Sequence, residues 1–271
     1  MKIAIAFFGI PRNSLICFPS ILENIYSVLE FDEVRSFYHF YNQDKVVSQR
    51  SGESSDLSSS NYSFFDNMDG FLEDPDACLI KWGFENIKKF GDTWGDGYSS
   101  IRNLIHQLNS LYEVTNIIES SKYDPDVVLF IRPDLLYHQL IPEFCLLGAQ
   151  KDSKSVYIPN WQWWNGFNDR FSICGKNSYR AYGKRILDME DFCHDNNRGV
   201  HSERLLKYSL LRHKSRVKAL NVTASRVRVS GLIVDEDFSG RRGMGKRENR
   251  LILRLARFRT WIDEVRFKFT R

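Results

Sequence analysis

The stretch YDPDVVLFIRPDLLY, residues 123–137, decides the fold class that we predict for this chain. Its apolar residues from Val127 to Ile131 are too few for a helix and are typical of a strand that is buried on both faces. The ladder ends at Pro133, which lacks the backbone N–H that a strand must donate. Arg132 and Asp134 therefore lie at the carboxyl end of a buried strand, which is where α/β proteins bind their ligands.

The segments around this strand alternate between extended and helical patterns, which favours an α/β fold with a central, mostly parallel sheet flanked by helices. The clearest helix, 99–121, has apolar residues at helical spacing and leads directly into the strand. The polar stretch SQRSGESSDLSSS, 48–60, is expected to be a mobile loop. The further predicted strands are 2–8, 34–41, 155–159, 170–174 and 226–233, and the further predicted helices are 19–30, 179–193 and 201–213.

Composition supports a packed protein without a membrane span. The 271 residues are 42% hydrophobic and 14% aromatic, which is ample for a core. No segment approaches the roughly 18 apolar residues of a spanning helix. The apolar segment 2–10 fits a first strand better than a signal peptide. The five cysteines form no C-x-x-C pair, which indicates free thiols and a reducing, cytoplasmic location.

Positive charge is concentrated at the carboxyl terminus. Residues 240–271 hold eleven Lys or Arg and three acidic residues, a net charge of +8, which leaves 4 − 8 = −4 for residues 1–239. We therefore predict a domain over 1–239 and a basic tail over 240–271. Leu251, Leu255, Phe258 and Trp261 recur at helical spacing among the arginines of this tail.

A basic amphipathic helix with aromatic residues is typical of an element that lies on an anionic membrane surface. The alternatives are a helix that packs back on the domain and a nucleic-acid patch. Nothing elsewhere in the sequence supplies a reader of bases, so we expect no nucleic-acid partner.

The turn after the first predicted strand is a candidate phosphate site. Gly9, Pro11 and Arg12 lie between that strand and a helix, so backbone N–H groups and a guanidinium could face an anion there. The turn lacks the spacing of a dinucleotide-binding loop or a P-loop. The alternative is that Gly9 and Pro11 only shape a tight turn and that Arg12 is a solvated surface charge.

Asp134 is the sharpest candidate for chemistry. A carboxylate just past a buried strand is well placed to hold Mg²⁺ or Mn²⁺, the ion that commonly neutralises a leaving diphosphate. Arg132 could instead supply that positive charge, as a planar fork on phosphate oxygens. The alternative is an ion pair between Arg132 and Asp134 that only tethers a loop.

The segment PNWQWWNGFNDRFSICG, 159–175, mixes aromatic, amide and acidic residues. Such mixtures suit sugars, whose C–H faces lie on rings while their hydroxyls seek amides and carboxylates. Trp163 and Trp164 are candidate sugar contacts, and Asp169 is the candidate for binding or activating an acceptor hydroxyl. The alternative is that the tryptophans are core and Asp169 caps a turn. Glu203 opens the predicted helix 201–213 and either interacts with its amino terminus or points into the site.

The order of these segments resembles GT-A-type glycosyltransferases of bacterial and viral polysaccharide synthesis, such as those of lipopolysaccharide or capsule. The resemblance rests on the first strand running into G-x-P-R, on YDPDVVLFIRPDL, on GFNDRFSICG and on SERLL, and it covers roughly residues 1–235. It implies a Rossmann-like GT-A domain that uses a nucleotide sugar. Gly9 to Arg12 would lie near the nucleotide, and Arg132 and Asp134 would take the role of the acidic DxD-like motif.

The resemblance also implies that Asn168, Asp169 and Arg170 lie beside the transferred sugar or the acceptor. The chain departs from the better-known pattern because RPD offers one carboxylate where DxD offers two, so the two alternatives are an enzyme that uses Mn²⁺ or Mg²⁺ and one that is independent of metal. The expected partners are a nucleotide-sugar donor, a glycan or lipid-linked acceptor, and the inner face of a membrane. The alternative function is a non-catalytic glycan-binding protein on the same scaffold.

Overall fold

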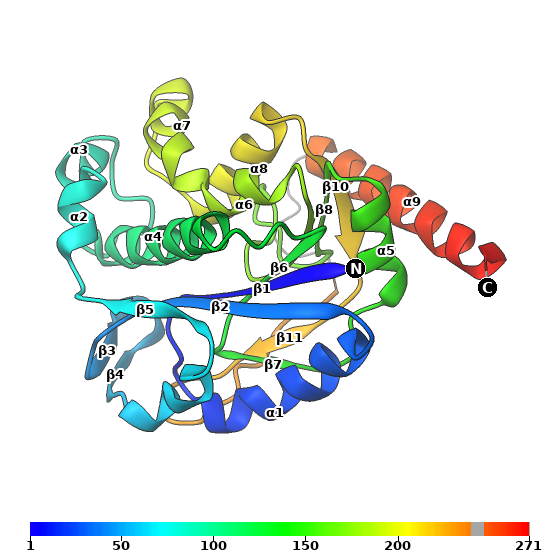
Figure 1. Cartoon of the computed structure of the whole chain (residues 1–271). Coiled ribbons are helices and arrows are strands. Elements are labelled where there is room, and N and C mark those ends of the chain that lie inside the picture. Colours follow the sequence, from blue (N-terminus) through cyan, green and yellow to red (C-terminus); the bar gives the residue numbers. More distant parts are fainter. Residues whose placement is uncertain (240–246, 271) are drawn as a thin grey trace.

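The structure, a computed structural model, describes residues 1–239 and 247–270. Its centre is a seven-stranded sheet with the strand order β10-β8-β9-β6-β1-β2-β5 (Figure 1). Most neighbours in this sheet run parallel, whereas β9 runs antiparallel to both β6 and β8. The strands of the sheet are β1 (Lys2–Phe8), β2 (Glu33–Tyr41), β5 (Asp69–Glu73), β6 (Val127–Ile131), β8 (Ser155–Pro159), β9 (Ser172–Gly175) and β10 (Arg216–Leu220).

Helices cover both faces of the sheet, which confirms the predicted α/β architecture (Figure 1). Alternate residues of β1 and β6 point to opposite faces, and all of Val127 to Ile131 are buried. One face packs against α1 (Ser14–Asn24) and α5 (Glu143–Lys151). The other face packs against α2 (Ala77–Lys81), α3 (Phe84–Lys88), α4 (Ser99–Ser120), α6 (Tyr179–Gly183), α7 (Met189–Asn196) and α8 (Ser202–Arg212).

Parallel pairing brings the candidate residues to one edge of the sheet. β1 and β6 pair in parallel from Ile3 with Val127 to Phe7 with Ile131. The turn that follows Phe8 and the Arg132 that follows Ile131 therefore meet at the carboxyl edge. Two small antiparallel sheets flank this edge, one of β7 (Leu135–Tyr137) with β11 (Ala224–Arg226) and one of β3 (Lys45–Ser48) with β4 (Glu53–Asp56).

The prediction of a mobile loop over 48–60 is wrong, because β4 and the end of β3 lie within it. Glu53 explains the order of this polar segment. Its carboxylate is buried and accepts hydrogen bonds from Arg228 Nη1 and from the backbone N–H of Val229. The buried side chains of Val46 and Leu57 anchor the same hairpin on the domain.

Three other predicted elements differ from the structure. The first helix runs over α1 and ends at Asn24, with a separate 3₁₀ turn at Tyr26–Leu29. The predicted helix 179–193 is divided into α6 and α7 by a 3₁₀ turn, Arg185–Asp188, where the side chain of Arg185 is fully buried. The predicted strand 226–233 is instead a turn closed by a bridge between Val227 and Ile233.

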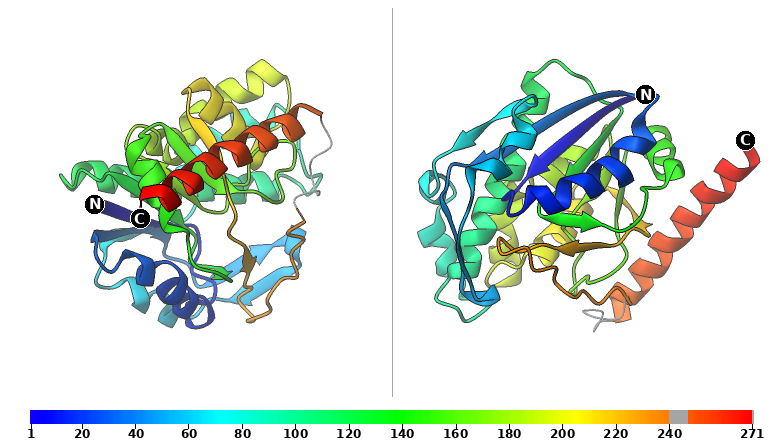
Figure 2. Two further views of the ribbon diagram at one scale, coloured as in Figure 1. Left: turned by 90° about the vertical axis from the view of Figure 1, so that its right-hand side faces the viewer. Right: turned by 90° about the horizontal axis from the view of Figure 1, so that it is seen from below.

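The carboxyl-terminal helix α9 (Arg247–Thr270) packs back on the domain against β10 and α5. It lies along the outside of the molecule with its last turns projecting (Figure 2). Asp263 on its inner side accepts hydrogen bonds from Tyr157 Oη at 2.5 Å and from Lys218 Nζ at 2.7 Å. Leu253 and Ala256 are buried on the same side. The tail is thus in contact with the domain, and residues 240–246 of its predicted range lie outside the described residues.

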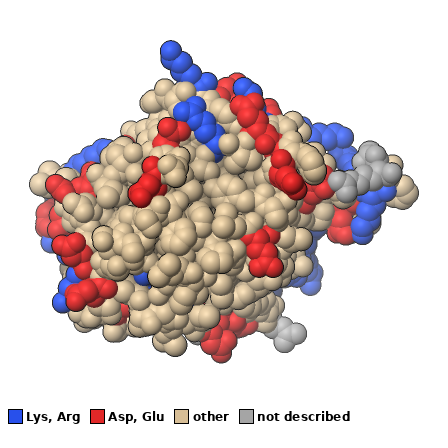
Figure 3. Space-filling model, turned by 60° about the horizontal axis from the view of Figure 1, so that its bottom comes forward, with Lys and Arg blue, Asp and Glu red and all other residues tan. Residues whose placement is uncertain are grey.

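Charged residues are sparse over the centre of the face that overlies α1 and gather at its margins (Figure 3). All five cysteines are free and buried. None of the helices within 1–239 and 247–270 is long and apolar enough to cross a membrane.

We expect His39 to make the stability of the fold depend on pH. Its side chain is fully buried on β2, and burial lowers its pKa to about 4. As pH falls, the imidazole of the unfolded chain takes up a proton before the imidazole of the folded chain does. The free energy of unfolding therefore decreases between about pH 6.5 and pH 4, by about 3 kcal/mol in total.

The variant His39→Phe should show a smaller loss of unfolding free energy over this range, measured by urea denaturation at several pH values. The ring of His39 packs edge-on against Phe71 with centroids 4.7 Å apart, a contact that phenylalanine can keep, while its Nε2 lies 3.1 Å from Glu73 Oε2, a contact that phenylalanine removes. Equal pH dependence in the two proteins would contradict the assignment to His39.

Candidate functional site

Three charged side chains meet where β1 and β6 end. The carboxylate of Asp134 is fully buried, and its Oδ1 accepts a hydrogen bond from Arg132 Nε at 2.9 Å. Its Oδ2 accepts from Arg132 Nη2 at 2.8 Å and also from Arg12 Nη1. Arg132 therefore holds both oxygens in a fork, and Arg12 ties the first strand's turn to the same carboxylate.

These pairs keep the groups ionised. Burial alone would raise the pKa of Asp134, but the charges and hydrogen bonds of Arg132 and Arg12 outweigh it and hold that pKa well below its usual range. Burial also opposes the charge on Arg132, and Asp134 nevertheless raises the pKa of that guanidinium. The site therefore presents fixed charges at neutral pH.

A second carboxylate, that of Asp169, is joined to this group through Gln107 of α4. The amide oxygen of Gln107 accepts a hydrogen bond from Arg132 Nη1 at 3.2 Å, and its Nε2 donates to Asp169 Oδ2 at 3.0 Å. The hydroxyl of Ser202, at the start of α8, donates to the same oxygen. Arg185 Nη2 lies 3.6 Å from it.

Asp169 is also ionised at neutral pH. Burial would raise its pKa, but the charge of Arg185 and the hydrogen bond from Ser202 act against burial, and the pKa is lowered. The hydrogen bonds that reach this carboxylate from described residues all end on Oδ2. The other oxygen, Oδ1, accepts no hydrogen bond from residues 1–239 and 247–270.

The loop that carries Asp169 has an unusual backbone. Gln162, Trp164 and Asn165 have positive φ values of 46°, 46° and 62°, a conformation that costs energy for residues other than glycine. At Gly166 an added Cβ would lie 2.0 Å from the carbonyl oxygen of Glu203. Only glycine therefore lets this loop lie against the first turn of α8, where Ser202 meets Asp169.

The tryptophans of this loop are mostly core residues. Trp161 and Trp163 are fully buried, and their indole N–H groups donate to the carbonyls of Val222 and Pro159. The ring of Trp163 has no surface to offer a sugar, so we no longer place it among the sugar contacts. Trp164 is half-buried and keeps that expected role.

Asn168 and Glu203 lie beside Asp169 but use their polar atoms within the protein. Asn168 Nδ2 donates to the carbonyl of Trp161 at 2.9 Å, and its Oδ1 accepts from the backbone N–H of Arg170 at 3.1 Å. Glu203 lies 3.1 Å from His201 Nδ1 and its side chain is 18% exposed. Asn168 therefore braces the loop, whereas the side chain of Glu203 pairs with His201 and is partly exposed.

In the turn after β1, Arg12 is the group that can still meet a phosphate. Gly9 has a positive φ of 97°, and its N–H already donates to Ser110 Oγ at 2.9 Å. The N–H of Ser14, which begins α1, donates to Asn61 Oδ1. Pro11 is buried and has no N–H. Gly9 and Pro11 thus shape the turn that presents Arg12.

Asp134 does not fit as a metal ligand in this arrangement. Both of its oxygens accept hydrogen bonds from guanidinium groups, so a cation would have to displace two arginines. Within residues 1–239 and 247–270, no group of three His, Cys, Asp or Glu side chains is arranged to hold a metal ion. We therefore derive no chemical step through a metal.

Several residues of the site carry no clear signal in the sequence. Gln107 is one polar residue among many on an amphipathic helix, and Arg185 sits inside a predicted helix. Glu236 and Arg226 are far from the RPD motif in sequence, yet Glu236 accepts hydrogen bonds from Arg170 and Arg226. The one available signal was RVRV, 226–229, where arginines alternate with valines in a segment that we expected to be a strand.

Two glycosyltransferase structures are similar to this one at low identity. The apo form of mouse xyloside xylosyltransferase 1 aligns with a TM-score of 0.42 and 10% identity, over 81% of this chain and 85% of that chain. The galactosyltransferase LgtC, in complex with donor and acceptor sugar analogs, aligns with a TM-score of 0.38 and 12% identity, over 81% and 73%. No family model matches the sequence, and no curated protein matches it. Both structural likenesses are distant.

We expect Asp134→Asn to destabilise the protein as well as impair its site. The change leaves the buried guanidinium groups of Arg12 and Arg132 without their anion, which should cost about 3 kcal/mol or more. Urea unfolding measures this loss.

The control is Asp124→Asn, which removes an exposed pair with Lys176 and should cost less than about 1 kcal/mol. Equal effects of the two substitutions would show that the pairs around Asp134 do not stabilise the fold.

Proposed function

We propose that this protein is a GT-A-type glycosyltransferase that moves a sugar from a nucleoside-diphosphate sugar to a glycan or lipid-linked acceptor. The observation that carries this proposal is the link between two charged groups at the carboxyl edge of the sheet. Gln107 joins the guanidinium of Arg132 to the ionised carboxylate of Asp169. A cation for a leaving diphosphate and a carboxylate for an acceptor hydroxyl are thus held side by side.

The two groups match the two needs of the transfer. When the bond between the sugar and the diphosphate breaks, negative charge grows on the diphosphate and must be neutralised. Arg12 and Arg132 provide positive charge beside the turn after β1. On the acceptor, a hydroxyl becomes a better nucleophile when a carboxylate accepts its proton. We assign that role to Asp169 through Oδ1.

We infer the biological setting from the sequence motifs that resemble polysaccharide-synthesis enzymes, and not from the geometry of the site. The donor sugar would be a hexose or deoxyhexose, and the acceptor would belong to surface polysaccharide synthesis such as lipopolysaccharide or capsule. The enzyme would work in the cytoplasm, at the inner face of a membrane. The buried free thiols are compatible with reducing surroundings.

We expect Asp169→Asn to lower kcat by roughly a hundredfold or more, because a general base commonly contributes that much. Donor binding should change little, since Arg12 and Arg132 are untouched. Initial rates with a panel of nucleotide sugars measure kcat, and the thermal shift caused by the donor measures donor binding.

The matched control is Asp195→Asn, on the exposed side of α7 where Asp195 pairs with Tyr208, and it should leave both quantities unchanged. If Asp169→Asn keeps wild-type turnover, Asp169 is not the base. If the unaltered protein binds glycans but neither transfers nor hydrolyses any donor, the binding-protein alternative replaces the enzyme.

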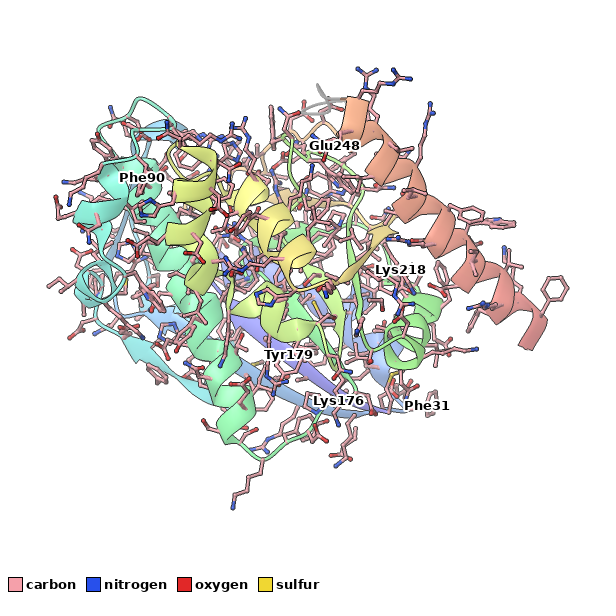
Figure 4. All side chains as sticks on the ribbon, turned by 90° about the horizontal axis from the view of Figure 1, so that it is seen from above. Phe31, Phe90, Lys176, Tyr179, Lys218 and Glu248 are labelled. Carbon is pink, nitrogen blue, oxygen red and sulfur yellow. The ribbon has the colours of Figure 1, made fainter. Side chains whose placement is uncertain are left out.

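We also propose that the outer side of α9 contacts an anionic membrane surface. Its inner side packs on the domain, and ring and basic side chains project from the opposite side (Figure 4). Phe258 and Trp261 stack with ring centroids 5.9 Å apart, and both are more than half exposed. The exposed residues of α9 include Arg250, Leu251, Arg254, Leu255, Arg257, Phe258 and Trp261.

This surface combines the two features that interfacial helices use. The apolar side chains can enter the boundary between headgroups and acyl chains, while the arginines meet anionic headgroups. Because Asn249, in the first turn of α9, donates to Asn165 of the Asp169 loop at 3.2 Å, the same helix would hold the site near a lipid-linked acceptor.

The membrane proposal predicts cosedimentation of the full chain with phosphatidylglycerol vesicles and little with phosphatidylcholine vesicles. Replacing Arg250, Arg254 and Arg257 together by Gln should weaken this binding by roughly a hundredfold, at about 1 kcal/mol for each charge.

The control is Ile80→Ser, which removes an 88% exposed apolar side chain on α2, at the opposite end of the molecule from α9 (Figure 1). It should leave vesicle binding unchanged. If the full chain stays in solution with both kinds of vesicle, α9 is a packing element only.

A further inference from the structure

Five arginines gather around the carboxyl edge of the sheet, although the sequence places them far apart. Two follow β1 and β6, one lies in the Asp169 loop, and two belong to the segment that includes and follows β11. We call them the arginine cluster: Arg12, Arg132, Arg170, Arg226 and Arg228.

Three carboxylates lie between members of the arginine cluster and connect them. Asp134 joins Arg12 to Arg132. Glu236 joins Arg170, with an Nη1 to Oε1 distance of 2.7 Å, to Arg226, with an Nε to Oε1 distance of 2.7 Å. Glu53 lies 3.2 Å from Arg228 Nη1 and 3.7 Å from Arg12 Nε. These ion pairs form two groups, one of Arg132, Asp134, Arg12, Glu53 and Arg228 and one of Arg170, Glu236 and Arg226. We call the eight side chains of both groups together the charged assembly.

This assembly has more positive than negative charge. Five guanidinium groups stand against three carboxylates, so two positive charges lack an anion. Asp169 and Arg185 lie beside it and add one charge of each sign, which leaves the excess unchanged. Cations that are removed from water without a matching anion are costly, and such a site favours a dianionic ligand.

The arginines of the two groups also repel one another. Burial, and after it the charge of Arg226, lowers the pKa of Arg228. Burial and Arg226 likewise lower the pKa of Arg170, and the charge of Arg132 acts in the same direction. An anion bound close to Arg226 would relieve repulsion that both Arg170 and Arg228 experience.

Hydrogen-bond donors for such an anion are present. Arg12 Nε is buried and has no hydrogen-bond partner among the described residues. The side chains of Arg226 and Arg228 are 33% and 18% exposed, so they can be reached from solvent. A guanidinium presents paired N–H groups that match two phosphate oxygens.

We propose that the arginine cluster binds a diphosphate group and supplies the charge neutralisation that a divalent cation would otherwise provide. Arg170, Arg226 and Arg228 thereby become ligand-binding residues together with Arg12 and Arg132. A diphosphate with one negative charge on each phosphorus centre matches the excess of two positive charges. The inference rests on the proposed function for its preferred source, the nucleotide sugar, although a lipid-linked diphosphate has the same chemistry.

The test is calorimetric titration of the full-length protein with inorganic pyrophosphate and with nucleoside diphosphates, in excess EDTA and then with Mn²⁺. We expect binding in EDTA, with Kd within about threefold of the value in Mn²⁺, and weaker binding as salt rises. Loss of all pyrophosphate and nucleotide binding in EDTA, with recovery in Mn²⁺, would overturn the proposal.

Arg228→Gln and Arg226→Gln should each raise Kd for pyrophosphate by roughly tenfold or more, as expected when a charge-assisted hydrogen bond is lost. Arg180→Gln is the matched control, because Arg180 is 59% exposed and pairs with Glu119, and it should leave Kd unchanged. Far-UV circular dichroism and urea unfolding identify any variant that fails to fold. If both cluster variants are folded and bind as tightly as the control, the proposal is wrong.

Two further measurements separate this inference from the proposed function. Transfer activity that requires Mn²⁺ in a protein that does not bind pyrophosphate would overturn the inference and leave the glycosyltransferase intact. Metal-free pyrophosphate binding without any transfer or donor hydrolysis would support the cluster and count against the enzyme. Competition between a nucleoside diphosphate and geranyl diphosphate identifies the source, since the one that displaces pyrophosphate at lower concentration is the preferred ligand.

Discussion

The ion pairs around Asp134 are the constraint on which the candidate site depends. This carboxylate is fully buried and holds two guanidinium groups that come from the ends of different strands. An unpaired ion in that position would be prohibitively costly, so the turn after β1 and the segment after β6 are fixed relative to each other. Arg132 then orients Gln107, and Gln107 orients Asp169. The position of the second carboxylate is therefore coupled to the first, while Ser202 and the packing of Gly166 on α8 hold it from the other side.

The sequence was sufficient to predict the central architecture because that architecture rests on short-range patterns. Val127 to Ile131 has the composition of a doubly buried strand, and the helix 99–121 has a clear apolar periodicity. Both appear in the structure almost as predicted, as β6 and α4. The residues Arg132 and Asp134 were found for the same reason, since the end of a parallel strand is a place that local sequence can identify.

The rest of the site depends on contacts between segments that are distant in the sequence. Glu53 orders a polar hairpin only because Arg228 and Val229 reach it from the other end of the domain. Trp163 looked like a sugar contact because its neighbours are polar, but its indole N–H bonds to the carbonyl of Pro159 and its ring is buried. Composition of a segment does not tell which of its side chains face inward. Long-range ion pairs and loop packing decide that.

The burial of the cysteines has a chemical consequence. Burial raises the pKa of every thiol of the chain, to about 11 for Cys78 and Cys193, to about 12 for Cys174, and also for Cys17 and Cys145. At neutral pH the thiols are therefore protonated and shielded from solvent. The thiolate, which is the form that reacts with alkylating agents and with disulfides, is almost absent. The protein should be inert toward thiol reagents while folded, so that a single cysteine introduced on its surface would carry a label without background.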